Sequence, residues 1–243
     1  MGELRLSVIL PAFNEADNIG RSISRAIVAC EALGLAFEVI VVDDGSNDGT
    51  RHLSEAICSQ DERVRTVCHP KNRGYGAALK SGILASRGEL IFFTDADLQF
   101  DIAEIESLLV YAGHYDIIAG YRAVRSDPFL RRLNAWGWGR IVDVLFDLNV
   151  IDVDCAFKVF NRRVFEAIPI HSVGAFVNTE ILVRAKASGF SIKELPVSHF
   201  PRTAGEQSGA DLRVIAKAFV ELSRLHGDLN EPTETQRGLL RSQ

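Results

Sequence analysis

Cysteine is scarce in this sequence, and its few copies stand apart from one another. The 243 residues include four cysteines, Cys30, Cys58, Cys68 and Cys155, with no CxxC pair and no histidine at the spacing of a zinc ligand. A disulfide framework and a structural zinc site are therefore not expected. The pattern is typical of ordinary buried thiols in a reducing compartment.

Long apolar runs and an excess of positive charge are also missing. No uncharged apolar stretch reaches the roughly 18 residues that a membrane-spanning helix needs, and the charged opening MGELRLSVILPAFNE does not have the pattern of a signal peptide. The chain has 27 lysines and arginines against 32 aspartates and glutamates, a net charge of -5. This balance argues against a nucleic-acid partner, because nucleic-acid binders are usually basic.

What remains is the composition of a globular protein, 47% hydrophobic and 24% charged. The length allows a substantial core. No repeat, low-complexity segment or convincing linker divides the chain. We expect one domain over residues 1–227 and a polar, disordered tail over residues 228–243.

Short β-rich runs alternate with helical patterns along the chain. The expected strands are 6–13, 37–44, 64–69, 89–95, 115–120, 154–161 and 191–200; the expected helices are 16–33, 48–59, 75–87, one starting near residue 101, 128–148, 178–188 and 211–225. Strands of the first half that are apolar on both faces and alternate with helices predict an α/β fold with a largely parallel sheet covered on both sides. Ligands bind such sheets beyond the carboxyl ends of the strands. Polar clusters follow three of the strands at that edge, namely Asn14-Glu15, Asp43-Asp44 and Asp95-Ala96-Asp97.

The segment DDGSNDGT (43–50) has the residue spacing of a calcium-binding EF-hand loop. An EF-hand loop follows a helix, however, and this segment follows the apolar run FEVIVV, which is expected to be a strand. We therefore interpret it as a strand-to-helix turn with Asp48 as the N-cap of the next helix. That interpretation leaves the second carboxylate, Asp44, unexplained.

The segment NRGYGAALKSG (72–82) superficially resembles a dinucleotide-binding fingerprint. Leu79 stands where a third glycine is needed, the segment follows the third strand instead of the first, and no GxxxxGK[ST] occurs anywhere. Dehydrogenase and P-loop interpretations are therefore rejected. Gly74 and Gly76 are expected to allow a close backbone approach at a helix N-terminus.

The segment FFTDADLQFD (92–101) places two carboxylates directly after a buried strand. Asp95 and Asp97 can point to one side and share a hard divalent cation, and Gln99 can add a neutral oxygen. Mg²⁺ and Mn²⁺ prefer such oxygen ligands and complete their shell with phosphate oxygens. A second acidic pair, Asp152 and Asp154, is the rival metal site.

Taken together, the motifs resemble a known family. LPAFNEADNI, VIVVDDGSNDGT, NRGYGAALKSG, FTDADLQFD, IIAGYR and DCAFKVF follow one another in the order seen in inverting family 2 glycosyltransferases with the GT-A fold, a Rossmann-like, mainly parallel sheet with helices on both faces. Residues 6–220 look like the dolichol-phosphate mannose synthase group, also called polyprenyl-phosphate hexosyltransferases. The marks of that group are DADLQ, Arg122 after a glycine, and HFPRTAGE.

The resemblance implies roles for individual residues. The pocket for the nucleotide base and ribose would be lined by Pro11, Phe13, Glu15, Val42 and Asp44. The sugar nucleotide and its metal would be held by Asp95, Ala96 and Asp97, with Gln99 as a metal ligand. Arg122 and Arg202 would contact phosphates or the sugar, and Arg131 or Arg132 would meet the phosphate of the acceptor lipid. Two positions depart from the group, which commonly has tyrosine in place of Phe13 and lysine in place of Ser208.

The expected reaction transfers a hexose, mannose in the first place, from a nucleoside-diphosphate sugar to a polyprenyl or dolichyl phosphate. GDP-mannose is the favoured donor and a UDP-sugar is the alternative. The cation stabilises the charge left on the departing diphosphate. The expected catalytic residues are Asp95, Asp97 and Arg122, and Asp154 joins them as a base if the acceptor is a sugar hydroxyl. A non-catalytic scaffold that binds nucleotide sugars is the alternative from another class.

The segment FLRRLNAWGWGRIVDVLF (129–146) mixes arginine, tryptophan and bulky apolar residues. This composition is typical of a helix that lies on a membrane surface, although an ordinary packed helix is the alternative and Gly137 and Gly139 weaken any helix here. A lipid acceptor without a spanning segment in the chain predicts a cytoplasmic protein, peripheral at the cytoplasmic face of a membrane, that works with a membrane-spanning partner.

Overall fold

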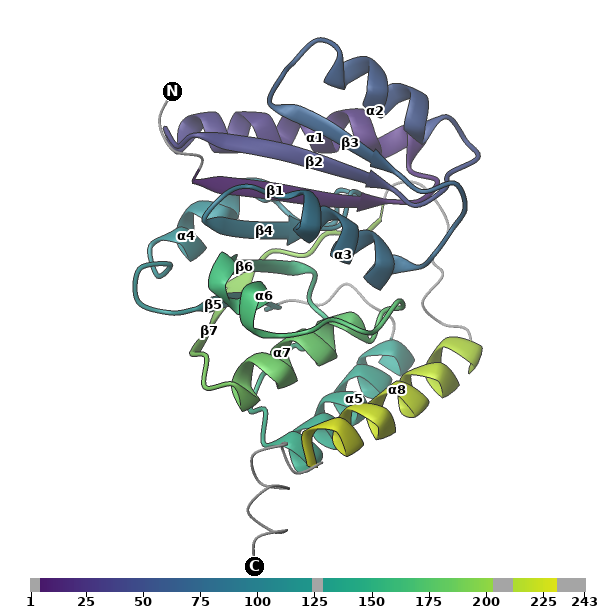
Figure 1. Ribbon diagram of the computed structural model, residues 1–243, viewed down its shortest axis with the longest axis vertical. Coiled ribbons are helices and arrows are strands. Elements are labelled where there is room, and N and C mark those ends of the chain that lie inside the picture. The colour runs from purple at the N-terminus through teal and green to yellow at the C-terminus, as the bar shows by residue number, and fades with distance from the viewer. Residues whose placement is uncertain (1–4, 124–128, 203–211, 231–243) are drawn as a thin grey trace, which may run out of the picture.

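Seven strands form one sheet in the computed structural model, which describes residues 5–123, 129–202 and 212–230 (Figure 1). The strands are β1 (Leu6–Ala12), β2 (Phe37–Asp43), β3 (Val64–Cys68), β4 (Leu90–Thr94), β5 (Ile117–Arg122), β6 (Phe157–Asn161) and β7 (Ile192–Val197). They lie in the order β3-β2-β1-β4-β6-β5-β7. Neighbouring strands are parallel except at β6, which is antiparallel to β4 and β5. The prediction of a largely parallel sheet is confirmed.

The sheet is buried on both faces because successive apolar side chains of a strand point to opposite faces. Leu6, Val8 and Leu10 of β1 belong to one core cluster, and Ile9 of the same strand belongs to the other. Continuous apolar strands of this kind are expected where helices cover both faces. The burial of both faces explains why β1 is apolar at every position except Ser7.

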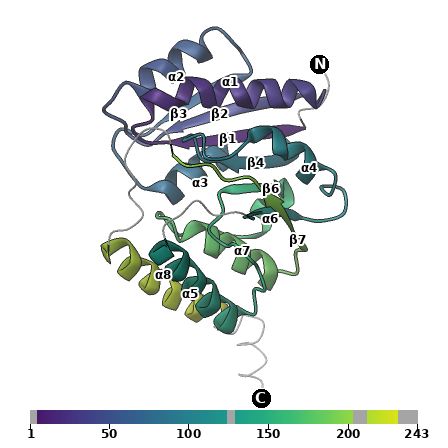
Figure 2. The ribbon, with the colours of Figure 1, turned by 180° about the vertical axis from the view of Figure 1, so that it is seen from behind.

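Helices cover the two faces of the sheet (Figures 1 and 2). The cluster on one face includes side chains of α1 (Ala16–Ala32), η1 (Ile102–Glu104) and α4 (Ile105–Leu109), and α2 (Thr50–Cys58) packs against it. The cluster on the other face includes side chains of α3 (Tyr75–Ala85), α5 (Phe129–Phe146), α6 (Arg162–Ala167), α7 (Val177–Ala187) and α8 (Leu212–Asn230). The layers are those of a doubly covered α/β fold.

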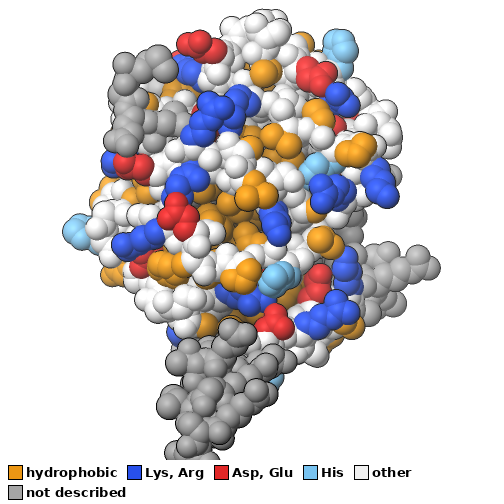
Figure 3. Space-filling model, viewed as in Figure 1, with side chains coloured by type: hydrophobic (Ala, Val, Ile, Leu, Met, Phe, Trp, Pro, Cys, Tyr) orange, Lys and Arg blue, Asp and Glu red, His pale blue; other side chains and the backbone are white. Residues whose placement is uncertain are grey.

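The helices α5 and α8 lie side by side outside α7 (Figures 1 and 2). Trp138 of α5 joins them, because its ring lies 5.5 Å from the ring of Phe219 on α8 and 6.0 Å from that of Phe176 at the start of α7. Within the described part of the chain, no helix has the length and apolar character to cross a membrane. On the face seen in Figure 3, basic side chains are spread among acidic and apolar ones instead of forming one patch.

Some element boundaries differ from those predicted. The strand expected over 154–161 begins at Phe157, because residues 152–156 form a turn, and α6 was not predicted. The strand expected over 191–200 ends at Val197. The helix α8 continues to Asn230, so the first three residues of the predicted tail are helical, and residues 231–243 lie outside the described part of the chain.

Candidate active site

The carboxyl ends of the parallel strands meet at one edge of the sheet, and the reversed strand β6 begins there. Thr94 at the end of β4 pairs with Phe157 at the start of β6, and β5 and β7 end together at Arg122 and Val197. The turn 152–156 therefore reaches the same edge as the loops that follow β1, β2 and β4. This edge is where ligands bind in such sheets.

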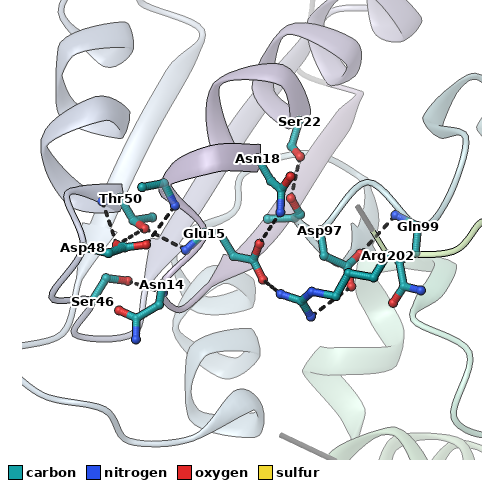
Figure 4. A network of polar contacts seen from close by, with 12 residues as sticks. Asn14, Glu15, Asn18, Ser22, Ser46, Asp48, Thr50, Asp97, Gln99 and Arg202 are labelled. Carbon is teal, nitrogen blue, oxygen red and sulfur yellow. Dashed lines mark hydrogen bonds and ion pairs between the residues drawn. The ribbon is translucent and has the colours of Figure 1, made fainter. Parts of the chain in front are cut away.

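At one end of this edge the loop after β1 is fastened to the loop after β2 (Figure 4). The backbone N–H of Asn14, whose φ is 56°, donates to Ser46 Oγ at 2.9 Å, and that of Ala16 donates to Asp48 Oδ2 at 3.0 Å. Asp48 Oδ1 accepts from the backbone N–H of Thr50 at 3.0 Å. Burial alone would raise the pKa of Asp48, but the hydrogen bonds from Thr50 and Ala16 outweigh it and hold the pKa below its ordinary value. Asp48 thus serves the strand-to-helix turn, but α2 begins at Thr50 with Gly49 as its N-cap, so the prediction of Asp48 as the N-cap is wrong.

Asp44, the carboxylate that the turn left unexplained, is 3% exposed and binds the loop after β3. Its Oδ1 accepts from the backbone N–H of Arg73 at 2.9 Å and lies 2.5 Å from Nδ1 of His69, and its Oδ2 accepts from the backbone N–H of Gly74 at 2.8 Å. His69 Nε2 in turn lies 2.9 Å from Ser81 Oγ. Since a carboxylate offers about four acceptor positions, most of those of Asp44 are occupied by this loop. The structure thus shows Asp44 holding the loop after β3, and its contact with the donor stays a prediction.

The two glycines before and within the first turn of α3 allow a close approach, as predicted, and the partner is protein backbone. A Cβ on Gly74 would lie 2.4 Å from the carbonyl oxygen of Val173, and one on Gly76 would lie 2.6 Å from that of Ser172. The backbone N–H of Ala77 donates to the same Val173 oxygen at 3.2 Å. The segment 172–174 therefore covers the start of α3, which leaves no room for a phosphate against these glycines.

The segment after β4 carries the two carboxylates of the DxD motif. The carbonyl oxygen of Ala96 accepts from Ser22 Oγ at 2.6 Å, and Asp97 Oδ1 accepts from the backbone N–H of Gln99 at 3.1 Å. Oδ1 of Asp95 is buried and has no hydrogen-bond partner. The backbone of the motif is thus fixed to α1 while one oxygen of Asp95 is left unsatisfied.

An arginine from a segment distant in the sequence, Arg202, contacts Asp97 of this motif. Arg202 forms an ion pair with Glu15, and its Nη1 lies 3.5 Å from Asp97 Oδ2 (Figure 4). Asn18 of α1 donates to the other oxygen of Glu15 at 2.7 Å. Gln99 brings the segment with Arg202 into place, because its backbone carbonyl accepts from the N–H of Phe200 at 2.8 Å and its side-chain amide donates to the Phe200 carbonyl at 3.0 Å.

The electrostatics of this cluster favour the neutral carboxyl form. Burial and the charge of Asp97 raise the pKa of Asp95 more than the nearby Tyr75 hydroxyl lowers it. Burial also raises the pKa of Asp97, against the effects of the Gln99 N–H and Arg202, and raises the pKa of Glu15 against those of Asn18 and Arg202. Glu15 and Asp97 therefore share Arg202, and the cluster is short of positive charge.

A hard divalent cation fits this donor set. Asp95 and Asp97 offer anionic oxygens of the kind that Mg²⁺ and Mn²⁺ bind, and Oδ1 of Asp95 is a buried acceptor without a donor. A bound dication would lower the pKa of both carboxyls and remove the cost of their burial. The side chain of Gln99 lies at the edge of the same cluster, although its amide nitrogen binds Phe200.

The other acidic pair is already bound to a protein cation. Asp152 is 4% exposed and forms a bidentate ion pair with Arg122, with Nε–Oδ2 and Nη2–Oδ1 distances of 2.7 and 2.8 Å. Glu194 of β7 accepts from the backbone N–H groups of Ile151 and Asp152, which fixes the start of the turn. Asp154 is exposed. Among the described residues no group of three metal-ligating side chains is found at either acidic pair, and the ion pair of Asp152 makes Asp95 and Asp97 the better candidates for a cation.

A groove of about 750 Å³ opens beside the cluster, between α4 and the segment after β7. His199 and Phe200, which lead to Arg202, line one side of it, and Val110 and Ala123 lie among its apolar residues. Phe200 is 47% exposed. The groove therefore borders the segment that carries the arginine of the cluster.

Comparison with known proteins identifies the family. The family model described as Glycosyl transferase family 2 matches residues 7–168, which is more than half of the chain. The chain belongs to this family. Among curated proteins, it is similar to Glycosyltransferase AglD of Haloferax volcanii, with 32% identity over 209 residues that make up 82% of this chain and 34% of the relative. The chain thus spans about a third of the length of that relative.

Solved structures share the fold of this family 2 member. Glucosyl-3-phosphoglycerate synthase from Mycobacterium tuberculosis, in complex with Mn²⁺ and UDP-glucose, has a TM-score of 0.71 at 19% identity, covering 96% of this chain and 81% of the other. Mannosyl-3-phosphoglycerate synthase from Rubrobacter xylanophilus has a TM-score of 0.69 at 20% identity, covering 95% and 77%. At these identities the likeness concerns the fold alone. The fold is GT-A, as predicted.

Not every residue expected at the site reaches its surface. Val42 is 0% exposed and Ala96 is 2% exposed, and Pro11 is buried as well, so their side chains lie beneath the surface. Phe13, in contrast, is 43% exposed at the end of β1. Arg131 and Arg132 fall in α5, where their side chains lie outside the described part of the molecule.

Sequence reasoning missed the residues that support the cluster from distant segments. Tyr75, Asn18 and Ser22 come from the helices α3 and α1, and His69 comes from the end of β3. No local pattern marks these residues. Glu194 stands in β7, and nothing in its neighbours indicates the turn that it holds.

Proposed function

We propose that this chain transfers a hexose from a nucleoside-diphosphate sugar in a reaction that depends on Mg²⁺ or Mn²⁺. The observation that carries the proposal is the state of Asp95 and Asp97. Both carboxyls have raised pKa values, and Asp95 has a buried oxygen without a donor. A site short of positive charge at the ligand-binding edge of the sheet suits a cation that arrives with a diphosphate.

The donor lies across the ends of β1 and β4 in this proposal. The exposed ring of Phe13 provides a stacking face for the nucleotide base. Arg202, now shared by Glu15 and Asp97, provides a guanidinium for the diphosphate. Of the residues predicted for the donor, Val42, Ala96 and Asp44 contribute by supporting these loops.

The cation is held by Asp95 and Asp97, with Gln99 as a further oxygen ligand. When bound, it neutralises the charge that develops on the departing diphosphate. Asp95 and Asp97 are ready to bind it because the loop between them is fixed by Ser22 and by the Gln99 N–H. Arg122, fixed by Asp152, supplies a second positive charge at the same edge.

The acceptor is a polyprenyl or dolichyl phosphate, and the hexose is mannose from GDP-mannose or another hexose from a UDP-sugar. The motif order and the segments DADLQ and HFPRTAGE support this acceptor. An acceptor phosphate oxygen attacks the anomeric carbon, the bond from that carbon to the β-phosphate oxygen breaks, and the nucleoside diphosphate leaves. The attacking phosphate is already ionised near neutral pH, so no strong base is required. Arg131 or Arg132 is proposed to hold it.

A hydroxyl acceptor is the second candidate, and one observation favours it. Asp154 is an exposed carboxylate on the turn that Arg122 and Glu194 fix at the active edge. A carboxylate in that position can take the proton of an attacking hydroxyl. A solved structure of glucosyl-3-phosphoglycerate synthase from Mycobacterium tuberculosis holds UDP-glucose and phosphoglyceric acid, so a small phosphorylated alcohol is the hydroxyl acceptor to test.

The lipid acceptor implies a place for the protein. A polyprenyl chain stays in the bilayer, so the domain of residues 1–227 is proposed to work at the cytoplasmic face of a membrane, as a peripheral protein or next to a membrane-spanning partner. The exposed apolar residues Val144 and Leu145 of α5 support contact with a lipid surface.

The test uses radiolabelled GDP-mannose and UDP-glucose with Mn²⁺, each offered with a short polyprenyl phosphate and with 3-phosphoglycerate. Label that moves into the organic phase supports the lipid acceptor, and label in a new water-soluble glycoside supports the hydroxyl acceptor. Asp97→Asn is expected to remove either product, whereas Asp61→Asn, at the opposite edge of the sheet, is the matched control. Transfer that persists in the presence of a chelator would overturn the role of the cation. Nucleotide binding without any transfer would favour a scaffold.

A further inference from the structure

Lys158 is a charged side chain in the middle of the sheet. It stands in β6, opposite Phe93 of β4 and Ala119 of β5, and it is 0% exposed. Within the described residues it is the one cation with no exposed surface. Burying an ammonium group is costly unless it is paired and hydrogen-bonded, so its surroundings have to compensate.

The ammonium group binds the turn that precedes its own strand. Nζ donates to the backbone carbonyl oxygen of Val153 at 3.1 Å and to that of Cys155. It also lies 6.0 Å from the centre of the Phe93 ring, at the outer limit of a cation–π contact. Two of its three donors thus hold the backbone of the turn 152–156 against the sheet.

That turn carries two side chains that the proposed reaction uses. Asp152 holds Arg122 by its bidentate ion pair, and Asp154 is the exposed carboxylate beside it. Glu194 fixes the start of the turn through Ile151 and Asp152, while Lys158 fixes its middle and end. The turn is therefore held at its start by the carboxylate of Glu194 and at its middle and end by the ammonium group of Lys158.

The charge of Lys158 interacts with ionisable groups of the turn 152–156 and with Asp95. Burial lowers the pKa of Lys158, while Cys155, Asp152 and Asp154 counteract this effect. Lys158 in turn lowers the pKa of Asp95. Lys158 therefore interacts electrostatically both with Asp95 and with the carboxylates of the turn.

We propose that Lys158 is a positioning residue for glycosyl transfer, which fastens the turn 152–156 so that Arg122 and Asp154 face the reacting groups; this inference rests on the proposed function. A purely structural lysine would affect the folding of the sheet and nothing else. A positioning lysine affects the chemical step, while the nucleotide still binds at the ends of β1 and β4.

The test compares Lys158→Met, which removes the donors and the charge, with Lys158→Gln, which keeps an amide donor. Lys158→Met is expected to lower kcat by about 10²-fold, because a small displacement of a catalytic group has effects of this size. KM for the donor and the affinity for UDP with Mn²⁺ are expected to change less than about threefold, since binding common to ground and transition state is untouched. Arg163→Met, which breaks an ion pair with Asp116 at the other end of β6, is the matched control and is expected to keep kcat.

Hydrogen exchange provides a measurement that does not depend on the reaction. Faster exchange in residues 152–156 of Lys158→Met, with β4 and β5 unchanged, supports the fastening of the turn even if no donor and acceptor pair is turned over. If the methionine variant does not fold, the glutamine variant serves: intermediate kcat with intermediate exchange supports the proposal. An unchanged kcat in a variant whose melting temperature has fallen would overturn it. An unchanged exchange rate in the turn would overturn it as well.

Discussion

The two halves of the ligand-binding edge begin from the same kind of sequence and end in different environments. In the half formed by β2 and β3, carboxylates that follow a buried strand bind mainly backbone N–H groups, as Asp44 and Asp48 do, and Asp44 also contacts the ring of His69. In the half formed by β1, β4, β6, β5 and β7, carboxylates of the same pattern face other charges. Asp97 lies near Arg202, and Asp152 binds Arg122.

The difference shows what decides whether an acidic pair serves the fold or a ligand. Backbone N–H groups satisfy a carboxylate without bringing a net charge, so the first half is complete within the protein. The DxD half is incomplete, because Oδ1 of Asp95 has no hydrogen-bond partner and Glu15 and Asp97 share Arg202. Three substitutions and one change of pH are expected to separate the two halves.

The largest effect is expected for Asp95→Asn. Turnover should fall by about 10²-fold or more, as when a group that stabilises transition-state charge is removed. The melting temperature should stay the same or rise, since the substitution removes a buried carboxyl with a raised pKa. Transfer assays and thermal unfolding at neutral pH measure the two effects. A variant with normal turnover would show that the halves do not differ in the way described.

Asp44→Ala is expected to have the opposite profile. It leaves the backbone N–H groups of Arg73 and Gly74 without their acceptor, at a cost of about 1–3 kcal/mol for each buried donor that stays unpaired. Binding of Mn²⁺ should be retained. Chemical denaturation and isothermal titration check this, with the exposed Glu62→Ala as a control that should change the free energy of unfolding by less than about 0.5 kcal/mol.

Gly76→Ala is expected to disturb the packing of α3 against the segment 172–174 and to lower the stability of the protein. Its Cβ would lie 2.6 Å from the Ser172 carbonyl oxygen and 2.8 Å from that of Gly174. Overpacking of this kind costs about 1–3 kcal/mol, and a protein of this size loses about 2–4 °C in melting temperature for each kcal/mol. Gly20→Ala, in α1 with no atom within 4 Å of the new Cβ, should instead stabilise the protein slightly. Equal melting temperatures for the two variants would contradict the close packing at Gly76.

The smallest effect is a difference in pH dependence. The pKa of Asp48 is lowered in the folded chain, so its contribution to stability is present above the unfolded pKa of about 4 and is lost as the pH falls. The pKa of Asp95 is raised, so the folded chain binds its proton more tightly and stability falls as the pH rises from about 4 past that raised pKa. Metal-free unfolding between pH 4 and pH 8, in the wild type and Asp95→Asn, measures the second slope. Affinity for Mn²⁺ should rise over the same range, because protons have to leave.

The sequence predicted the parts of the fold that depend on neighbours along the chain. Apolar runs flanked by helical patterns located the strands, and the DxD motif was placed correctly because Asp95 directly follows the buried run of β4. The wrong boundaries fall where a turn and a strand have similar composition. Residues 154–156 read as part of a strand, but the carbonyl groups of Val153 and Cys155 bind Lys158 and bend the chain.

Contacts between distant segments could not be predicted. Nothing near Arg122 in the sequence indicates Asp152, and nothing near Gly76 indicates the segment 172–174. The sequence also did not show which side chains near a strand end are available to a ligand. Val42 and Asp44 belong to an apolar run followed by carboxylates, as Asp95 does. Val42 is nevertheless fully buried, and the oxygens of Asp44 accept hydrogen bonds from the protein. The apolar pattern of a strand indicates that the strand is buried, but it does not indicate which hydrogen-bond donors the neighbouring segments place at its end.

The reversed strand β6 has a consequence for the order in which the protein is assembled during synthesis. The strands β1 to β4 pair with one another without help from later segments, whereas β4 and β5 are joined only through β6. On the ribosome, β1 and β4 are therefore able to pair before Lys158 has emerged. The part of the edge that carries Arg122 and Asp154 is completed later, when β6 enters between β4 and β5 and Glu194 of β7 binds the start of the turn.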